Sequence, residues 1–152
     1  MFSLTGKNAI VTGGGSGIGQ SICKTFAKQG AHVGIIDINI EAAEKTASEI
    51  KENGGSAEPH TCDVTQQAEV KEVFERISKV NPIDCLINNA GIAHVGNVLN
   101  TSEEDFDKVL RVNVKGVYNC LQAGVKHMRP NGGSIVNIAS TVSVMAIDDR
   151  FA

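Results

Sequence analysis

Positive charge is scarce in this sequence, and the scarcity limits the partners that it can serve. Fourteen lysines and arginines stand against 17 aspartates and glutamates, a formal net charge of −3. The basic residues form no stripe that would follow a phosphate backbone, which argues against a nucleic-acid partner. No apolar run is long enough to cross a bilayer, and the first eleven residues lack the basic head and apolar stretch of a signal peptide. We therefore expect a cytoplasmic protein that acts on neither nucleic acid nor membrane.

Paired cysteines and grouped histidines are missing as well. The four cysteines are widely scattered and form no Cys-x-x-Cys pair, as expected of separate, reduced thiols in the cytosol. The four histidines share no spacing that would let them bind one ion. The sequence therefore predicts no metal site.

The residues that are present have a globular composition, 41% hydrophobic and 20% charged. Strand-like apolar runs alternate with segments of helical periodicity along the whole chain. The predicted strands are residues 8–11, 32–36, 56–62, 84–87 and 134–138; the predicted helices are residues 17–29, 40–53, 66–80 and 115–128, with another starting at about residue 102. This order predicts a single α/β domain over residues 1–152, a doubly wound parallel sheet with helices on both faces.

Apolar spacing also predicts which face of each helix is buried. Ile18, Ile22 and Phe26 recur every four residues and predict one buried stripe on the first helix. Ser102 is the predicted N-cap of the fourth helix, which carries Phe106, Val109 and Leu110. The predicted buried residues are Val70, Val73, Phe74, Ile77 and Val80 in the third helix, and Val117, Leu121, Val125 and Met128 in the last.

A glycine-rich stretch, TGGGSGIG at Thr12–Gly19, lies directly between the first strand and the first helix. Glycines there permit a tight turn and close approach of the backbone to a diphosphate, and the helix N-terminus offers unpaired N–H groups. The spacing is GxxxGxG, and the alternative is a flexible turn without a ligand. The position between strand and helix favours nucleotide binding. The residues assigned to the cofactor here are Gly13, Ser16, Gly17, Ile18 and Gly19.

Asp37 ends the second strand, 18 residues after Gly19. A carboxylate at that place can accept both ribose hydroxyls of an adenosine and would repel a 2′-phosphate. Its other interpretation is an ordinary aspartate at the end of a strand. With the glycine loop upstream, Asp37 favours NAD over NADP as the cofactor.

Four more motifs follow in order: CDVT at residues 62–65, NNAG at 88–91, RVNVKG at 111–116 and GGSIVNIAS at 132–140. Together with the glycine loop, they resemble the short-chain dehydrogenase/reductase family across essentially the whole chain. The resemblance implies a Rossmann-like fold and hydride transfer between a nicotinamide and a secondary alcohol or ketone. It assigns adenine binding to Asp63 and Val64, cofactor contacts to Asn89, Ala90 and Gly91, and catalytic roles to Asn113 and Ser140.

Each of these residues also has a plainer interpretation. Asp63 would be a turn aspartate, Asn89 a loop residue that satisfies backbone groups, Asn113 the cause of a helix kink, and Ser140 one loop serine among several. Singly, the plainer interpretation is favoured for Asn113 and Ser140. Five motifs in order at the family's spacings favour function for the set.

The family's catalytic tyrosine usually lies thirteen residues after the serine, and its lysine four residues further on. That places the tyrosine at position 153, one residue past Ala152, and Tyr118 is the one tyrosine in the sequence. Without a sixth strand the fifth would be an exposed apolar edge, so we expect this sequence to be the N-terminal part of a longer chain. The resemblance also implies a homo-oligomer, a tetramer or dimer, through the helix at 115–128. The alternative is a truncated, inactive nucleotide-binding or interaction module.

Overall fold

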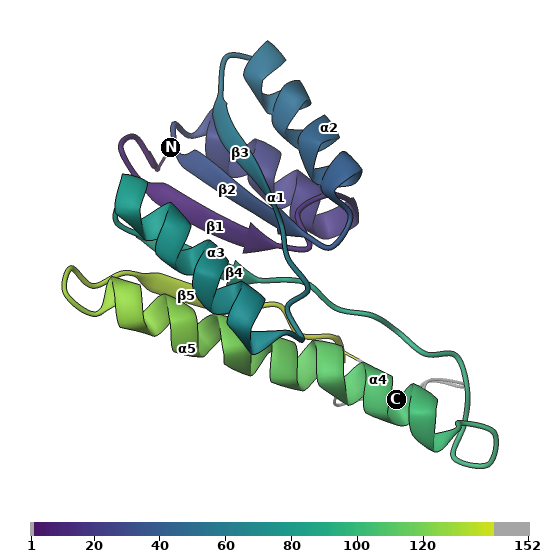
Figure 1. The fold of residues 1–152 in the computed structure, drawn as a ribbon. Coiled ribbons are helices and arrows are strands. Elements are labelled where there is room, and N and C mark those ends of the chain that lie inside the picture. Colours follow the sequence, from purple (N-terminus) through teal and green to yellow (C-terminus); the bar gives the residue numbers. More distant parts are fainter. Residues whose placement is uncertain (1, 142–152) are drawn as a thin grey trace.

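The computed structural model describes residues 2–141 and shows the predicted alternation of strands and helices (Figure 1). The loop expected after the fifth strand begins at Ser140, and its part from residue 142 onward lies outside the described residues. Each predicted element is found, with its ends within about two residues of the expected positions. The strands are β1 (Asn8–Thr12), β2 (His32–Asp37), β3 (Ser56–Thr61), β4 (Cys85–Asn88) and β5 (Ser134–Asn137); the helices are α1 (Gly17–Lys28), α2 (Ile40–Glu52), α3 (Gln67–Val80), α4 (Glu103–Leu110), the π-helix η1 (Arg111–Gly116) and α5 (Val117–Met128).

The five strands form one parallel sheet in the order β3-β2-β1-β4-β5. Helices α1 and α2 pack on one face, and α3 and α5 pack on the other (Figure 1). Each face has its own core, one around Ile10, Phe74 and Leu86 and the other around Val11 and Ile35. The chain changes winding direction between β1 and β4, so a crevice is expected at the carboxyl ends of these strands.

The predicted buried face of α1 is confirmed for Ile22 and Phe26, which are half-buried against the core, and wrong for Ile18. Ile18 is 65% exposed, whereas Gly19, Cys23 and Ala27 are buried against the sheet. The small side chains let α1 approach the strands closely, and a pattern built on large apolar residues does not register them. The four-residue spacing of the predicted stripe was correct, but the centre of the buried face lies one residue further along the helix.

The helices of the other face need similar corrections. Val80, at the end of α3, and Val125, in α5, are exposed. The predicted break between the fourth helix and the last is absent, because the cap residue Arg111 keeps helical dihedral angles and the chain continues through η1 into α5. Figure 1 shows α4, η1 and α5 as one rod that runs beyond the sheet. The α5 residues that are buried are Asn119, Cys120, Ala123, Gly124 and Met128.

Strand β5 lies at the end of the sheet next to β4. Val136 and Ile138 are exposed at this end, as predicted for the fifth strand. The N-cap prediction for α4 is also confirmed, since the Ser102 hydroxyl accepts a hydrogen bond from the Asp105 amide. Within residues 2–141, no helix has both the length and the apolar character that crossing a bilayer requires.

Candidate functional site: a nucleotide cavity at the carboxyl ends of the strands

A cavity of about 530 Å³ opens where the sheet changes its winding direction, beyond the carboxyl ends of β1, β2 and β4. All the residues predicted to bind the cofactor line it except Gly19, which is buried at the start of α1. Stretches far apart in the sequence therefore meet at one place. The lining residues are Gly13, Ser16, Gly17, Ile18, Ile36, Asp37, Ile38, Cys62, Asp63, Val64, Asn89, Ala90, Gly91, Ile92, Lys108 and Val112.

Two glycines of the loop are required by the backbone geometry. Gly13 has a φ of +65°, which favours glycine, and a Cβ there would lie 2.9 Å from the Cα of Ala90. A Cβ on Gly19 would overlap the carbonyl oxygen of Gly13 and the side-chain amide of Asn89. The loop after β1 can therefore pack against the loop after β4 only with glycine at these positions.

The N-terminus of α1 faces the cavity with unpaired backbone donors. Within residues 2–141, the N–H groups of Gly17, Ile18 and Gly19 have no acceptor. Ser16 is the N-cap residue, and its hydroxyl makes no capping hydrogen bond. Free N–H groups and the positive end of the helix dipole favour an anionic ligand at this point.

Thr12, at the end of β1, holds the loop after β4 that lines the cavity. No pattern in the sequence predicted this role. Its buried hydroxyl accepts hydrogen bonds from the backbone N–H groups of Asn89 and Ala90, both at 3.0 Å, and donates to the carbonyl of Ile87 at 3.4 Å. The Asn89 side chain donates to the carbonyl oxygens of Thr12 and Gly13 at 3.0 and 3.2 Å. These bonds hold the two loops in register, and they agree with the plainer interpretation of Asn89.

Asp37 holds the turn that closes the glycine loop. One carboxylate oxygen accepts from the Gly15 N–H at 2.9 Å, and the other accepts from the Asn39 N–H at 3.0 Å. A carboxylate has about four acceptor positions, so two remain for a ligand. The structural role of a strand-end aspartate and a role in ribose binding are therefore compatible.

Asp63 and Val64 form another part of the wall. The Asp63 carboxylate accepts from the Thr65 N–H at 2.9 Å, as in the turn that its plainer interpretation describes, and the Val64 carbonyl accepts from the buried Asn119 side chain at 2.9 Å. Between them and β3 lies Cys62, whose burial raises the pKa of its thiol to about 12. A thiol that stays protonated is a poor nucleophile, so Cys62 contributes packing to this wall.

Neither predicted catalytic residue lines the cavity. Asn113 lies in η1, and its side chain accepts from the Ile92 N–H and donates to the Ile92 carbonyl, both at 2.9 Å. The side chain thus clamps the loop after β4 to the π-helical turn, and single π-turns inside α-helices often mark functional sites. Ser140 is exposed three residues beyond the end of β5, on the same edge of the sheet.

Several lining residues were not identified from the sequence. Ile36 ends the apolar run of β2, and Ile38 and Val112 each neighbour a motif residue in the sequence. Ile92, which follows the NNAG motif, was expected to form an apolar part of the wall and does line the cavity. Lys108 lies in α4 outside every motif, and no sequence signal marks it. Cys62, the remaining lining residue, belongs to the CDVT motif without an assigned role. Among residues 2–141, no three histidine, cysteine, aspartate or glutamate side chains gather as a metal site would need.

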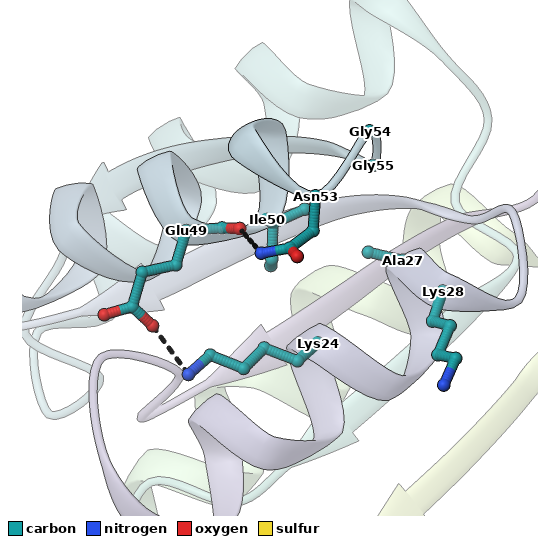
Figure 2. Close-up of a pocket in the computed structure, with 8 residues that line it drawn as sticks. All are labelled: Lys24, Ala27, Lys28, Glu49, Ile50, Asn53, Gly54 and Gly55. Carbon is teal, nitrogen blue, oxygen red and sulfur yellow. Dashed lines mark hydrogen bonds and ion pairs between the residues drawn. The ribbon is translucent and has the colours of Figure 1, made fainter.

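A second cavity, of about 630 Å³, lies between the carboxyl-terminal ends of α1 and α2 (Figure 2). Ala27 and Ile50 form its apolar floor, and the ion pair between Lys24 and Glu49 crosses one side at 2.6 Å. The Asn53 side chain donates to the Glu49 carbonyl at 2.7 Å. Helix carboxyl ends present carbonyl oxygens, which repel anions. Lys24, Lys28 and Glu49 are the charged residues of its lining, so the two helix ends, and not the side-chain charges, argue against a phosphate-bearing ligand here.

Known proteins resemble this chain over nearly its whole length. The family model described as "short chain dehydrogenase" matches residues 7–151. An uncharacterized oxidoreductase of Thermotoga maritima is 43% identical over 152 residues, and D-threitol dehydrogenase of Mycolicibacterium smegmatis is 35% identical over 153. These alignments cover 98% and 99% of this chain and 59% of each relative.

A crystal structure of NAD+-bound xylitol dehydrogenase superimposes with a TM-score of 0.94 at 33% identity. The match covers 98% of this chain and 58% of that one. The chain therefore spans somewhat over half the length of the proteins that it matches. The fold over this length, a Rossmann-like parallel sheet, is the one predicted from the sequence.

Proposed function

The chain belongs to the short-chain dehydrogenase family, and from that premise we propose that it binds NAD and serves hydride transfer between the nicotinamide and a secondary alcohol or ketone. The observation that carries the proposal is the cavity itself. Unpaired amides of α1 and the Asp37 carboxylate line or border one space, as a diphosphate and a ribose diol would require. The hydride chemistry would belong to the bound nicotinamide, and this chain would position it.

The roles proposed for the residues follow their places in the cavity. The amides of Gly17, Ile18 and Gly19, with Gly13 and Ser16 beside them, would hold the diphosphate. The two free acceptor positions of Asp37 would take the ribose hydroxyls. The remaining wall would enclose the adenosine and the rest of the cofactor; it includes Asp63, Val64, Asn89, Ala90 and Gly91.

Asn113 and Ser140 would act on the substrate side. By family resemblance, Ser140 would bind the substrate oxygen and Asn113 would hold a water that relays the proton. The Asn113 side chain binds both backbone polar groups of Ile92, so its orientation is fixed before any ligand arrives. In this proposal the protein works in the cytoplasm on a small molecule.

Replacement of Asp37 tests the cofactor. We expect Asp37→Ala to weaken NAD binding by about tenfold or more, because hydrogen bonds to a charged group contribute about 1.5–3 kcal/mol. The variant should also lose discrimination against NADP. Asp37→Asn keeps one acceptor oxygen without the charge, so it should lose the discrimination and keep more of the affinity. Calorimetry with both nucleotides measures this, with Glu72→Ala, an exposed change on α3, as the control. An unchanged preference in both Asp37 variants would remove Asp37 from the ribose role.

Turnover is a separate test from binding. The protein should oxidise some secondary alcohols with NAD, measured as NADH absorbance over a panel of polyols, hydroxysteroids and 3-hydroxyacyl thioesters. Nucleotide binding without turnover on the whole panel would favour the alternative, a nucleotide-binding module. Failure to bind NAD or NADP at all would contradict both.

We further propose that the protein is a homo-oligomer that associates through the rod of α4, η1 and α5. Phe106, Leu110, Val114 and Tyr118 recur every four residues along it and are all exposed, as is Val125. An exposed apolar strip of this kind marks an interaction surface. Light scattering after size exclusion should give a dimer or tetramer mass, and Val114→Glu should lower it. A monomer mass for the unmodified protein would contradict the proposal.

A further inference from the structure

The charges on the nucleotide cavity do not match its proposed ligand. Its lining includes two carboxylates, those of Asp37 and Asp63, and among the described residues one cation, Lys108. A dinucleotide brings two negative phosphates to a wall whose formal side-chain charge is already negative. The α1 amides offset part of the repulsion, and Lys108 is the one charged side chain of the lining that can offset more.

Among the described residues, the Lys108 ammonium has no ion-pair partner that would compete with a bound phosphate. Three lysines of the described residues are held in ion pairs, Lys7 by Asp84, Lys24 by Glu49 and Lys126 by Glu75. Within residues 2–141, the Lys108 ammonium has neither a hydrogen bond nor an ion pair. No carboxylate of the same helix lies within ion-pair distance of it, although Glu104 and Asp105 precede it by four and three residues. Its charge is therefore not already used by the protein.

The position of Lys108 in α4 also places it at the cavity. It lies in α4, so it reaches the cavity from the rod, while the glycine loop and Asp37 approach from β1 and β2. The Asn113 clamp on Ile92 ties the rod to the loop after β4. The ammonium is thus carried by a helix that is joined through η1 to the loop after β4.

We propose that Lys108 is a specificity-determining residue, whose ammonium attracts the negative charge of the bound dinucleotide and favours the more highly charged NADP. In this inference, which rests on the proposed function, Asp37 and Lys108 act in opposition. Asp37 disfavours a 2′-phosphate, and Lys108 partly offsets that effect. The balance between them would set how strongly NAD is preferred.

The expected effect is modest, because Lys108 is exposed. Interactions between exposed charges contribute about 0.2–1 kcal/mol, so we expect Lys108→Met to weaken NAD binding by about two- to fivefold. NADP carries one more phosphate, so its affinity should fall further and the preference for NAD should rise. Both losses should shrink at 1 M salt, where the screening length is about 3 Å.

The experiment is calorimetric titration with NAD and with NADP at low and at high salt. Lys108→Met keeps the length of the side chain and removes the charge, and Lys108→Arg should restore the affinity if charge is what matters. The control is Lys115→Met, on the same rod but outside the cavity lining, which should leave both affinities unchanged.

The outcomes separate this inference from the function on which it rests. An unmodified protein that binds neither nucleotide would overturn the proposed function itself. A protein that binds, with Lys108→Met equal to it at low salt, would overturn the role of Lys108 alone. Equal losses for NAD and NADP, or a loss that Lys108→Arg does not restore, would overturn the role in selectivity.

Discussion

The two larger cavities of the described residues have similar volumes but meet opposite ends of helices. The larger, between α1 and α2, meets the carboxyl ends of two helices, and its lining holds the Lys24–Glu49 ion pair and a further cation, Lys28. The smaller, at the carboxyl ends of the strands, meets the amino end of α1 and has unpaired amides on its wall. A choice by volume alone would select the cavity between α1 and α2, which is not the proposed nucleotide site. The direction of the helix dipoles and the presence of unsatisfied donors identify the site.

The largest expected effect comes from removing the support beneath the smaller cavity. Thr12→Val keeps the shape of the side chain and leaves the N–H groups of Asn89 and Ala90 without an acceptor. An unsatisfied buried group costs about 1–3 kcal/mol, and these two N–H groups are only partly buried, so we expect about 2 kcal/mol of lost stability in denaturant unfolding.

Two variants control for that prediction. Thr12→Ser keeps the hydroxyl and should retain most of the stability. Asn53→Ala removes an exposed hydrogen bond at the other cavity and should cost far less than Thr12→Val. If Thr12→Val and Asn53→Ala were equally stable, the supporting role of the Thr12 hydroxyl would be wrong.

Glycine substitution gives the next effect and compares the cavities directly. Gly19→Ala puts a methyl group against the Gly13 carbonyl, and such crowding costs about 1–3 kcal/mol. If the loop adjusts to relieve it, NAD affinity should fall by about five- to a hundredfold. Gly55→Ala crowds Ile50 and Ala27 at the other cavity. Gly55→Ala should lower the melting temperature and leave NAD affinity unchanged. A drop in NAD affinity would contradict the assignment of the nucleotide to the smaller cavity alone.

Much of this site could be predicted because its residues are local to strand ends. The glycine loop, Asp37 and the NNAG motif each follow a strand that its apolar run predicts, and Asp63 follows the weaker third strand. Parallel strands bring their carboxyl ends to one edge. Topology then gathers these residues without any knowledge of side-chain contacts. That is why nearly the whole predicted cofactor set lines one cavity.

What could not be predicted depends on contacts between distant segments. Thr12 looks like an ordinary strand residue until the loop after β4, more than seventy residues later, donates to it. Lys108 reaches the cavity only because α4, η1 and α5 form one rod, and the sequence suggested a break there. The buried face of α1 was misplaced because glycine and alanine, not isoleucine, permit close packing on the sheet.

The smallest expected effect belongs to the larger cavity. Lys24 and Glu49 are both partly exposed, and the contact with Lys24 lowers the pKa of the Glu49 carboxyl. Exposed ion pairs contribute little to stability, because water and salt screen them. We therefore expect Lys24→Met to leave both the unfolding midpoint and the NAD affinity within experimental error at pH 7. A clear change in NAD affinity would mean that the two cavities communicate through α1, since Lys24 lies seven residues beyond Gly17 on that helix. The opposite polarity of the two helix ends would then no longer be enough to assign the nucleotide to one cavity alone.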